Sequence, residues 1–334
     1  PFRALNNQRD VQRYVGGVEG EFEIAGKAAI WDAYVQYGET NSREQLRDII
    51  INANYNNAID AVFAPAGNAI GVPAGTIVCR STLTNPTNGC VPLNILGTGV
   101  ATPAAIDYVL GDPYRDQKLK QTVVGANLSF TPFALWAGDV SLAVGAEYRK
   151  EEVSGFVPTD LQTGFQVGNY LPTFGEYDVK EAYLEAVVPL GFGFIFNGAV
   201  RATDYSTSGY VTTYKLGGTW QPIDDIMLRG TYSRDIRAPN LNELFQAGTS
   251  RTNTLTNAFV NPATTITFRE TTTGNLDLDP EKADTYSAGV VLTPRFLPGL
   301  SASVDYFNIT VEGAIGQYFA QDIFNRCNEG ITRF

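Results

Sequence analysis

Residues 139–150 read DVSLAVGAEYRK, and their pattern decides the fold. One parity carries Val140, Leu142, Val144, Ala146 and Tyr148, and the other carries Ser141, Gly145, Glu147 and Arg149. Alternation with a period of two predicts a β-strand that has one apolar and one polar face. The segment is longer than an ordinary strand of ~5–6 residues and suffices for the ~9–11 tilted residues that cross a bilayer.

The same alternation recurs along the chain. It is present at 14–24, 28–38, 121–130, 179–188, 192–203, 210–220, 226–235, 284–293 and 300–310, which makes about ten strands in all. Short turns fall near 25–27, 131–138, 189–191, 221–225 and 294–299, whereas long segments occupy 39–118, 151–176, 236–282 and 312 onward, with one short exception at 205–209. Short turns on one side and long loops on the other are typical of a transmembrane antiparallel β-barrel, and a soluble β-sandwich has no reason for such sorting.

Composition removes several function classes. The chain has 24 Lys and Arg against 35 Asp and Glu, so its net charge is 24 − 35 = −11, and no basic tract offers nucleic acid a binding surface. It has no His, which excludes His-dependent triads and His-ligated zinc or haem. No apolar run approaches the ~18 residues of a membrane-spanning helix. Asp277 and Asp279 fall short of a calcium ligand set, so we expect no metal, no cofactor and no enzymatic activity.

Aromatic residues gather near the ends of the expected strands. Phe133, Trp136 and Trp220 lie beside short turns and would form one interfacial girdle, and Tyr37, Tyr148, Tyr177, Tyr205 and Tyr210 would form the outer one. Lys180 and Arg234 share the apolar parity, but they lie close to loops, where a long side chain can snorkel to water.

The charged residues of mid-strand positions share the polar parity and are therefore expected to face the barrel lumen. The candidates are Glu19, Glu21, Glu147, Arg149, Glu181, Glu185, Arg201, Lys215, Arg229 and Asp235. A mixed-charge wall is the ordinary interpretation, because barrel interiors are polar. A sharper interpretation is that some of these side chains hold or release another part of the protein during transport.

The long segments contain cysteines and short helical patterns. Cys79 and Cys90 lie close together in a stretch rich in Gly, Pro, Asn and Thr, so a disulfide and an oxidising compartment are expected, which leaves Cys327 without a partner. Helical spacing at 42–60, with Ser42 as N-cap, and at 102–110 and 315–325 predicts short helices that fold over the barrel mouth rather than separate domains.

Several stretches resemble the TonB-dependent outer-membrane receptors. IMLRGTYSRDIRAPNLNELF at 226–245 is similar to the family's late-barrel signature, in which a strand ends in Arg237-Ala238-Pro239 and is followed by a short helical Glu243-Leu244-Phe245. Further similarity lies at 140–150, at 176–205, in NLDLDPEKADTYSAGVVLTPRFLPGLSASVDYFNITVEGAI at 275–315, and in the cysteine loop CVPLNILG at 90–97. Pro239 would hold its predecessor extended, so we expect the motif to shape a turn rather than to touch substrate.

The resemblance implies a function as well as a fold. Residues 1–334 would be part of one barrel domain, about ten strands of a barrel of about 22, in the outer membrane of a Gram-negative bacterium. The missing plug domain, the remaining strands, outer-membrane lipid and TonB would be its partners, and a scarce solute such as an iron–siderophore complex its substrate. Two alternatives are a passive porin-like channel and a surface-exposed binding or scaffold barrel within an envelope assembly.

Overall fold

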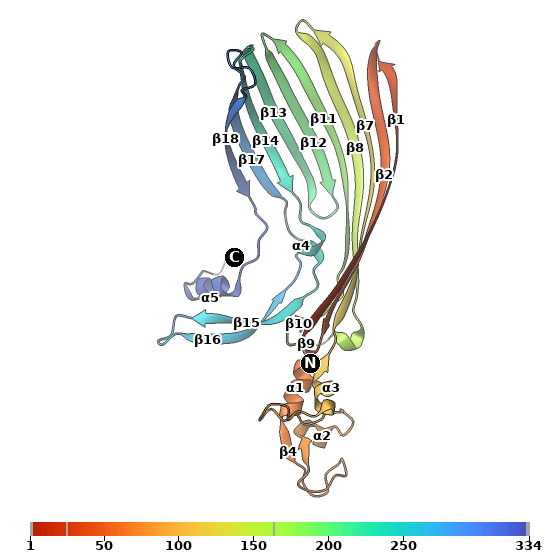
Figure 1. Cartoon of the computed structure of the whole chain (residues 1–334), viewed down its shortest axis with the longest axis vertical. Coiled ribbons are helices and arrows are strands. Elements are labelled where there is room, and N and C mark those ends of the chain that lie inside the picture. Colours follow the sequence, from red (N-terminus) through yellow and green to blue (C-terminus); the bar gives the residue numbers. More distant parts are fainter. Residues whose placement is uncertain (1–2, 25, 163, 332–334) are drawn as a thin grey trace.

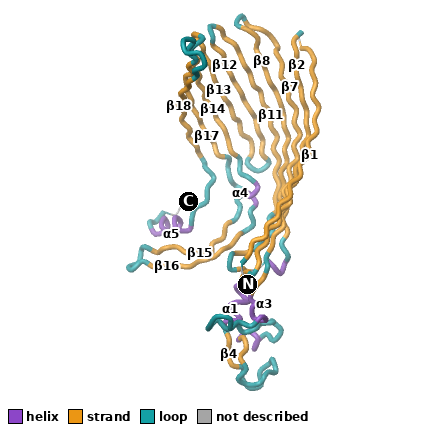
Figure 2. The backbone as a smooth tube through the Cα atoms, in the orientation of Figure 1, coloured by secondary structure: helices purple, strands orange, loops and turns teal. Residues whose placement is uncertain are grey.

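The computed structural model describes residues 3–24, 26–162 and 164–331. Ten long strands form one antiparallel sheet, and each pairs with the strand that follows it within the sheet (Figures 1 and 2). The strands are β1 (Ala4–Ile24), β2 (Lys27–Arg47), β7 (Tyr114–Leu135), β8 (Gly138–Phe156), β11 (Phe174–Gly191), β12 (Phe194–Tyr205), β13 (Gly209–Ile223), β14 (Ile226–Arg237), β17 (Glu281–Leu292) and β18 (Ala302–Glu312). The antiparallel β fold and the number of long strands are thereby confirmed.

One register runs through the middle of the sheet and separates two faces, and within the described strands it shifts only next to the tight turns, at Pro189–Gly191, Trp220–Ile223 and Phe130–Phe133. Ala33 pairs with Ala126, Ala126 with Ala146, Ala146 with Ala182, and Ala182 with Ala202, so a single row of alanines crosses five strands. The next residue of each strand points to the opposite side, because strand side chains alternate. We call the side of these alanines the apolar face and the side of Glu147, Glu181 and Arg201 the polar face.

The connections are sorted by length. Tight turns join the strands at one end of the sheet, and the long segments 48–113, 157–173 and 238–280 leave from the other end, as Figure 1 shows. The short connection 206–208 is the exception on the long-loop side. The two strands of the first hairpin extend for 21 residues each, and β2 thereby runs into the segment 39–118 that the sequence pattern assigned to a loop.

The predicted helix over 42–60 is wrong in its first part. Residues 42–47 continue β2, where they pair with β1 on one side and mostly with β7 on the other, and the helix α1 (Asn52–Ile59) begins only later. Ser42 is not an N-cap, since its hydroxyl lies 3.5 Å from the carbonyl oxygen of Gln117 on β7. Backbone pairing on two sides outweighs a helical spacing of three apolar residues.

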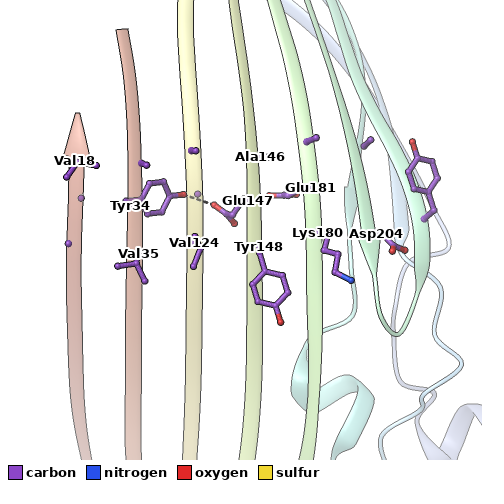
Figure 3. A pocket seen from close by; sticks show the side chains of 18 residues that line it. Val18, Tyr34, Val35, Val124, Ala146, Glu147, Tyr148, Lys180, Glu181 and Asp204 are labelled. Carbon is purple, nitrogen blue, oxygen red and sulfur yellow. Dashed lines mark hydrogen bonds between the residues drawn. The ribbon is translucent and has the colours of Figure 1, made fainter. Parts of the chain in front are cut away.

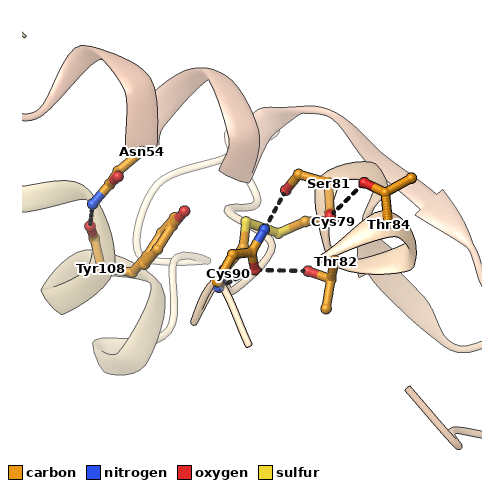
Figure 4. The surroundings of a disulfide bond; sticks show 8 residues. Asn54, Cys79, Ser81, Thr82, Thr84, Cys90 and Tyr108 are labelled. Atoms are coloured by element: carbon orange, nitrogen blue, oxygen red, sulfur yellow. Dashed lines mark hydrogen bonds between the residues drawn. A yellow bond between two sulfur atoms is a disulfide. The ribbon is translucent and has the colours of Figure 1, made fainter. Parts of the chain in front are cut away.

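Residues 48–113 fold into a small module that projects away from the sheet (Figure 1). Its elements are β3 (Ile49–Ile50), α1, β4 (Ala61–Phe63), β5 (Ile77–Cys79), α2 (Arg80–Thr84), α3 (Pro103–Val109) and β6 (Leu110–Gly111). A disulfide joins Cys79 and Cys90 (Figure 4), and Cys79, Ala58 and Ala105 are all fully buried within this module. Cys327 is free and exposed.

The other long segments carry short elements that lie near the loop end of the sheet. They are the 3-10 turn η1 (Thr159–Leu161), β9 (Gly164–Phe165), β10 (Gly168–Asn169), α4 (Leu241–Phe245), the hairpin β15 (Thr249–Asn257) and β16 (Thr264–Thr272), and α5 (Ala320–Asn328). The helices α3 and α5 overlap the predicted segments 102–110 and 315–325. Within the described residues, no helix has the length and apolarity needed to cross a membrane.

On the polar face, glycines leave space in which a long side chain can pass over the neighbouring strand and contact the strand beyond it. The ring of Tyr34 lies over Gly125 on β7 and its hydroxyl donates to Glu147 on β8, at 2.7 Å. In the same way, Tyr183 lies over Gly145 and donates to Asn127, also at 2.7 Å. A Cβ at Gly145 would stand 2.4 Å from the Tyr183 ring, so the crossing requires glycine there.

We therefore expect Gly145→Ala to lower the stability of the barrel by about 1–3 kcal/mol, the usual cost of overpacking. Gly16→Ala is the matched control, since a Cβ at that strand position meets nothing within 4 Å. The temperature at which the folded barrel band is lost on SDS gels would measure both variants. Equal melting of Gly145→Ala and Gly16→Ala would show that the crossing contributes nothing.

Removing the disulfide has a local effect. We expect the double variant Cys79→Ser, Cys90→Ser to destabilise the module by about 2–4 kcal/mol, the typical loss for a short ring. Limited proteolysis should then cut within 48–113 while the sheet stays resistant, because the module has its own core. Cys327→Ser, which removes the free thiol, should leave the cleavage pattern as it is in the parent.

Candidate functional site

The polar face of the sheet brings the predicted charged residues to one side. The register places all ten there: Glu19, Glu21, Glu147, Arg149, Glu181, Glu185, Arg201, Lys215, Arg229 and Asp235. Only some of them contact one another. The face is therefore a wall with separate polar clusters rather than one continuous site.

One cluster is a chain of hydrogen bonds that crosses four strands. Arg13 on β1 donates from Nε to Gln36 Oε1 at 3.0 Å, and Gln36 Nε2 donates to Gln121 Oε1 at 2.9 Å. Gln121 Nε2 donates in turn to Glu151 on β8, at 3.2 Å. Arg149 then lies 3.4 Å from Glu151 and 3.8 Å from Glu147, which joins this chain to the Tyr34 crossing.

A second cluster lies nearer the tight turns. Asn127 donates to Asp32 at 2.8 Å and accepts from Tyr183, whose ring also lies 5.3 Å from the guanidinium carbon of Arg201. Arg201 is 3.5 Å from Glu181. Charge and aromatic contacts thus fix the side chains of neighbouring strands against one another.

The third cluster contains a residue that the sequence analysis did not single out. Arg229 on β14 reaches across Gly289 of β17 and makes two hydrogen bonds to Asp305 on β18, at 2.8 and 2.6 Å. Asp305 has the polar parity of segment 300–310, so the alternation already contained the signal. The pairing itself depends on the order of strands, which the pattern does not give.

Other predicted residues have no charged partner on this face. Among the described residues, Glu19, Glu21, Glu185 and Lys215 form no ion pair, and Asp235 accepts a hydrogen bond from Ser233 at 2.9 Å. Arg149 Nε is buried and makes no hydrogen bond despite its proximity to Glu151. Glu19, Glu21, Glu185 and Lys215 therefore remain available to whatever occupies the space in front of the wall.

The prediction of an outer girdle is wrong for two of its five tyrosines. Tyr177 and Tyr205 have the polar parity, because Tyr177 pairs with Glu151 and Tyr205 pairs with Val179 of the polar face. They pack in an apolar cluster with Val153, Val179 and the α4 residues Leu241 and Leu244. Tyr37, Tyr148 and Tyr210 do carry the apolar parity. The loop helix that covers Tyr177 could not be placed from strand periodicity alone.

The strand-loop motif builds this covering helix. Arg237 ends β14, Ala238 and Pro239 lead to the N-cap Asn240, and Glu243, Leu244 and Phe245 belong to α4. Asn240 Oδ1 accepts from the backbone N–H of Glu243 at 3.0 Å, and Glu243 Oε2 accepts from that of Asn240 at 2.8 Å. This capping box satisfies N–H groups at the helix start, and Leu244, 2% exposed, anchors α4 on the polar face.

The hairpin β15–β16 extends from α4 and is polar at its surface. Glu270 accepts from Asn253 Nδ2 at 2.7 Å and lies 3.5 Å from Arg251. The hydrogen bond from Asn253 and the nearby positive charge hold the pKa of Glu270 below its ordinary value. Tyr170, which precedes β11, is half-buried, and this burial raises its pKa.

On the apolar face, two basic residues near the loops, Arg234 and Lys180, each lie near an acidic side chain. Arg234 makes two hydrogen bonds to Asp284 on β17, at 2.8 and 2.7 Å, beside a row of three tyrosines. Tyr214 and Tyr232 share a hydrogen bond of 3.2 Å between hydroxyls, and Tyr232 stacks on Tyr286 at 4.6 Å. Lys180 is largely exposed and lies 3.8 Å from Asp178.

The row of alanines leaves a depression on the apolar face (Figure 3). The cavity has a volume of about 880 Å³ and is lined by Val18, Val35, Val124, Ala146 and Tyr148 among others. Lys180 and Asp204 lie at its border in Figure 3.

In the described part of the chain, no group of three or more acidic or cysteine side chains could hold a metal ion.

Comparisons with known proteins agree with this geometry. The family model described as TonB dependent receptor-like, beta-barrel, matches residues 5–333. No protein of curated function matches the chain. Solved structures do: the siderophore receptor PirA from Acinetobacter baumannii has a TM-score of 0.53 and 16% identity over 91% of this chain and 35% of its own.

Two further receptors are similar at lower scores. PirA from Pseudomonas aeruginosa has a TM-score of 0.45 and 15% identity, covering 89% of this chain and 45% of its own. The ferric enterobactin receptor PfeA from Pseudomonas aeruginosa has a TM-score of 0.43 and 13% identity, covering 91% and 53%. The chain thus spans between a third and about half of the length of these receptors.

The docking of α4 can be tested at its buried anchor. We expect Leu244→Ala to release α4 from Tyr177 and Val179, with a loss of about 2–5 kcal/mol as for other buried leucines. Leu276→Ala is the control, since Leu276 belongs to the same connection but is 58% exposed. Hydrogen exchange of the amides of 241–245 should accelerate in Leu244→Ala only. Unchanged exchange there would contradict the anchor.

Proposed function

The chain belongs to the TonB-dependent receptor-like β-barrel family, and we propose that it forms part of the wall of a receptor that imports a scarce metal chelate of siderophore type. Members of this family are receptors and transporters of the Gram-negative outer membrane, not enzymes. The observation that carries the proposal is the polar face, on which cross-strand contacts fix charges such as Glu181 and Arg201 and whose loop end is covered by α4. Such a wall suits a solute path, because it is polar and rigid.

The polar face is the side that we assign to the lumen. The apolar face would contact outer-membrane lipid, since an unpaired charge costs about 2–4 kcal/mol at the bilayer midplane and the face keeps its charges paired near the loop end. The long segments 48–113, 157–173 and 238–280 would then lie outside the cell and capture the solute.

The unpaired groups of the wall suit a plug as partner. Glu185 and Lys215 point to the same face and have no ionic or hydrogen-bonded counterpart there among the described residues, and Arg149 Nε makes no hydrogen bond although it lies 3.4 Å from Glu151. A plug domain with complementary charges would satisfy them, and TonB would supply the force that changes these contacts. The mechanism requires no covalent chemistry, only the making and breaking of polar contacts.

Energy dependence tests the function directly. Cells that carry the receptor as their sole iron-uptake route should accumulate radio-iron supplied as ferric siderophores, and a protonophore should abolish accumulation while surface binding remains. Accumulation that persists with the protonophore, together with ion conductance of the purified protein in planar bilayers, would instead identify a passive channel.

The wall residues can be tested in the same assay. We expect Arg201→Ala and Glu185→Ala to lower uptake several-fold at equal surface abundance, because both charges face the proposed path. Arg295→Ala is the control: Arg295 is also paired, with Asp225 at 2.8 Å, but it lies beside the tight turn 224–225. Uptake equal to the parent in Arg201→Ala and Glu185→Ala would contradict a role of these charges in transport.

A further inference from the structure

We propose that Arg237 is the positioning residue that holds two extracellular segments, 238–280 and 313–331, as one lid on the barrel mouth. The proposal rests on the proposed function for the purpose of the lid, which is to capture the solute. Its geometry stands on contacts alone. Arg237 is the last residue of β14 and faces the polar side, directly opposite Glu281, the first residue of β17.

Arg237 joins three parts of the chain through two carboxylates. Its Nη1 lies 3.0 Å from Glu243 Oε2 in α4, and its Nη2 donates to Glu281 Oε1 at 2.7 Å. The same Glu281 oxygen accepts the backbone N–H of Ile315 at 2.6 Å, so the segment after β18 is held at this point too. A planar guanidinium can serve two carboxylates at once, which an ammonium group does less well.

Glu243 passes this constraint to both arms of the hairpin. Its carboxylate closes the capping box of α4, and its backbone carbonyl accepts from Asn275 N at 2.8 Å. Gln246 O accepts from Gly274 N at 2.9 Å, so the residues before β15 and after β16 are tied to the same helix. At Gly274, a Cβ would stand 2.4 Å from Leu244 O, so this close approach requires glycine.

Helix α5 is held on the hairpin by side chain to backbone contacts. Gln321 Oε1 accepts from Thr256 N at 2.7 Å, and its Nε2 donates to Thr256 O at 2.9 Å. Gln317 donates to Thr272 Oγ1 at 2.9 Å, and the rings of Phe259 and Phe324 lie 5.9 Å apart. Hairpin and α5 thus form one body, shown beside each other below the sheet in Figure 1.

This arrangement predicts which distances depend on Arg237. The contacts within the lid do not involve Arg237, whereas the contacts that fix the lid to β14 and β17 converge on it. The lid also meets β11 through Leu244 on Tyr177 and meets β10 through the hydrogen bonds of Asn169 with Gly248 and Ser250, and these contacts do not involve Arg237. Loss of the guanidinium should therefore free the lid from β14 and β17, which widens the range of positions it takes against the barrel, and leave its interior intact. If Arg237 only supported the local fold, its loss would disturb the interior of the lid together with its position on the barrel.

Electron–electron resonance distances between spin labels in the complete receptor test the proposal. One label at Ala263, in the exposed hairpin tip, is paired with one at Arg9 on β1 in a Cys327→Ser background, which reports lid against barrel. The other pair is Ala263 and the native Cys327 of α5, which reports the interior of the lid. The bonded cysteines Cys79 and Cys90 stay unlabelled.

We expect Arg237→Gln to replace a narrow Ala263–Arg9 distance distribution with a broad one, while the Ala263–Cys327 distribution stays narrow. Arg237→Lys should give an intermediate width for Ala263–Arg9, and Arg295→Gln, at the tight-turn end, should match the parent. Combining Arg237→Gln with Glu281→Gln should broaden the distribution no further than Arg237→Gln alone, because the ion pair that Glu281→Gln removes is already lost with the guanidinium and a glutamine oxygen can still accept from the Ile315 N–H.

The outcomes separate the two ideas. An unchanged Ala263–Arg9 distribution in Arg237→Gln, or a broadened Ala263–Cys327 distribution, overturns the role of Arg237 whatever the uptake. Failure of the parent receptor to accumulate ferric siderophore overturns the proposed function but leaves the distance result standing. If both hold, ferric siderophore uptake should fall in Arg237→Gln and recover in part in Arg237→Lys.

Discussion

The structure depends on one constraint, the two-residue alternation that the backbone ladder carries through ten strands and that shifts register only next to tight turns among the described residues. A shift of one residue in any pairing would turn every later side chain to the wrong face, because the period of a strand is two. Charges such as Glu181 would then meet the side of Ala182, and the apolar row would meet the side of the polar clusters. All functional geometry of the wall follows from keeping this register.

Glycines on the polar face reinforce the register by letting side chains bind two strands away. Tyr34 lies over Gly125 and Tyr183 over Gly145, and Asp305 lies over Gly289 where it meets Arg229. Each contact bridges a strand that contributes no side chain at the crossing. Such a bridge fails if the middle strand slips by one residue, because a residue with a side chain would then take the place of the glycine and block the crossing. The polar contacts of the wall therefore specify pairing as well as surface chemistry.

The sequence contained the strands and the faces but not the partners. Periodicity is local, so it placed Glu147, Arg201 and Lys215 on one side without the neighbour order that joins Arg229 to Asp305. It misjudged 42–47, where pairing on two sides overrode a helical spacing, and Tyr177 and Tyr205, where a loop helix covers aromatic rings that face inward. The motif ending in Glu243-Leu244-Phe245 indicated a turn and a short helix, but its link to Glu281 and Ile315 is visible only in three dimensions.

The same bidentate arginine–aspartate interaction occurs on both faces of the sheet and has a different effect on each. Arg229 and Asp305 lie on the polar face, where the gain of an exposed pair is small, so their value lies in tying β14 to β18 across β17. Arg234 and Asp284 lie on the apolar face, where either charge alone would be costly, and tyrosines flank the pair with hydroxyls directed to one another. On that face the pair replaces snorkelling, because the fork of the guanidinium satisfies the carboxylate within the sheet itself. Arginine therefore ties strands together on the polar face and neutralises a carboxylate on the apolar face. Arg237, where the polar face meets the loops, ties segments outside the sheet to its strands in the same way.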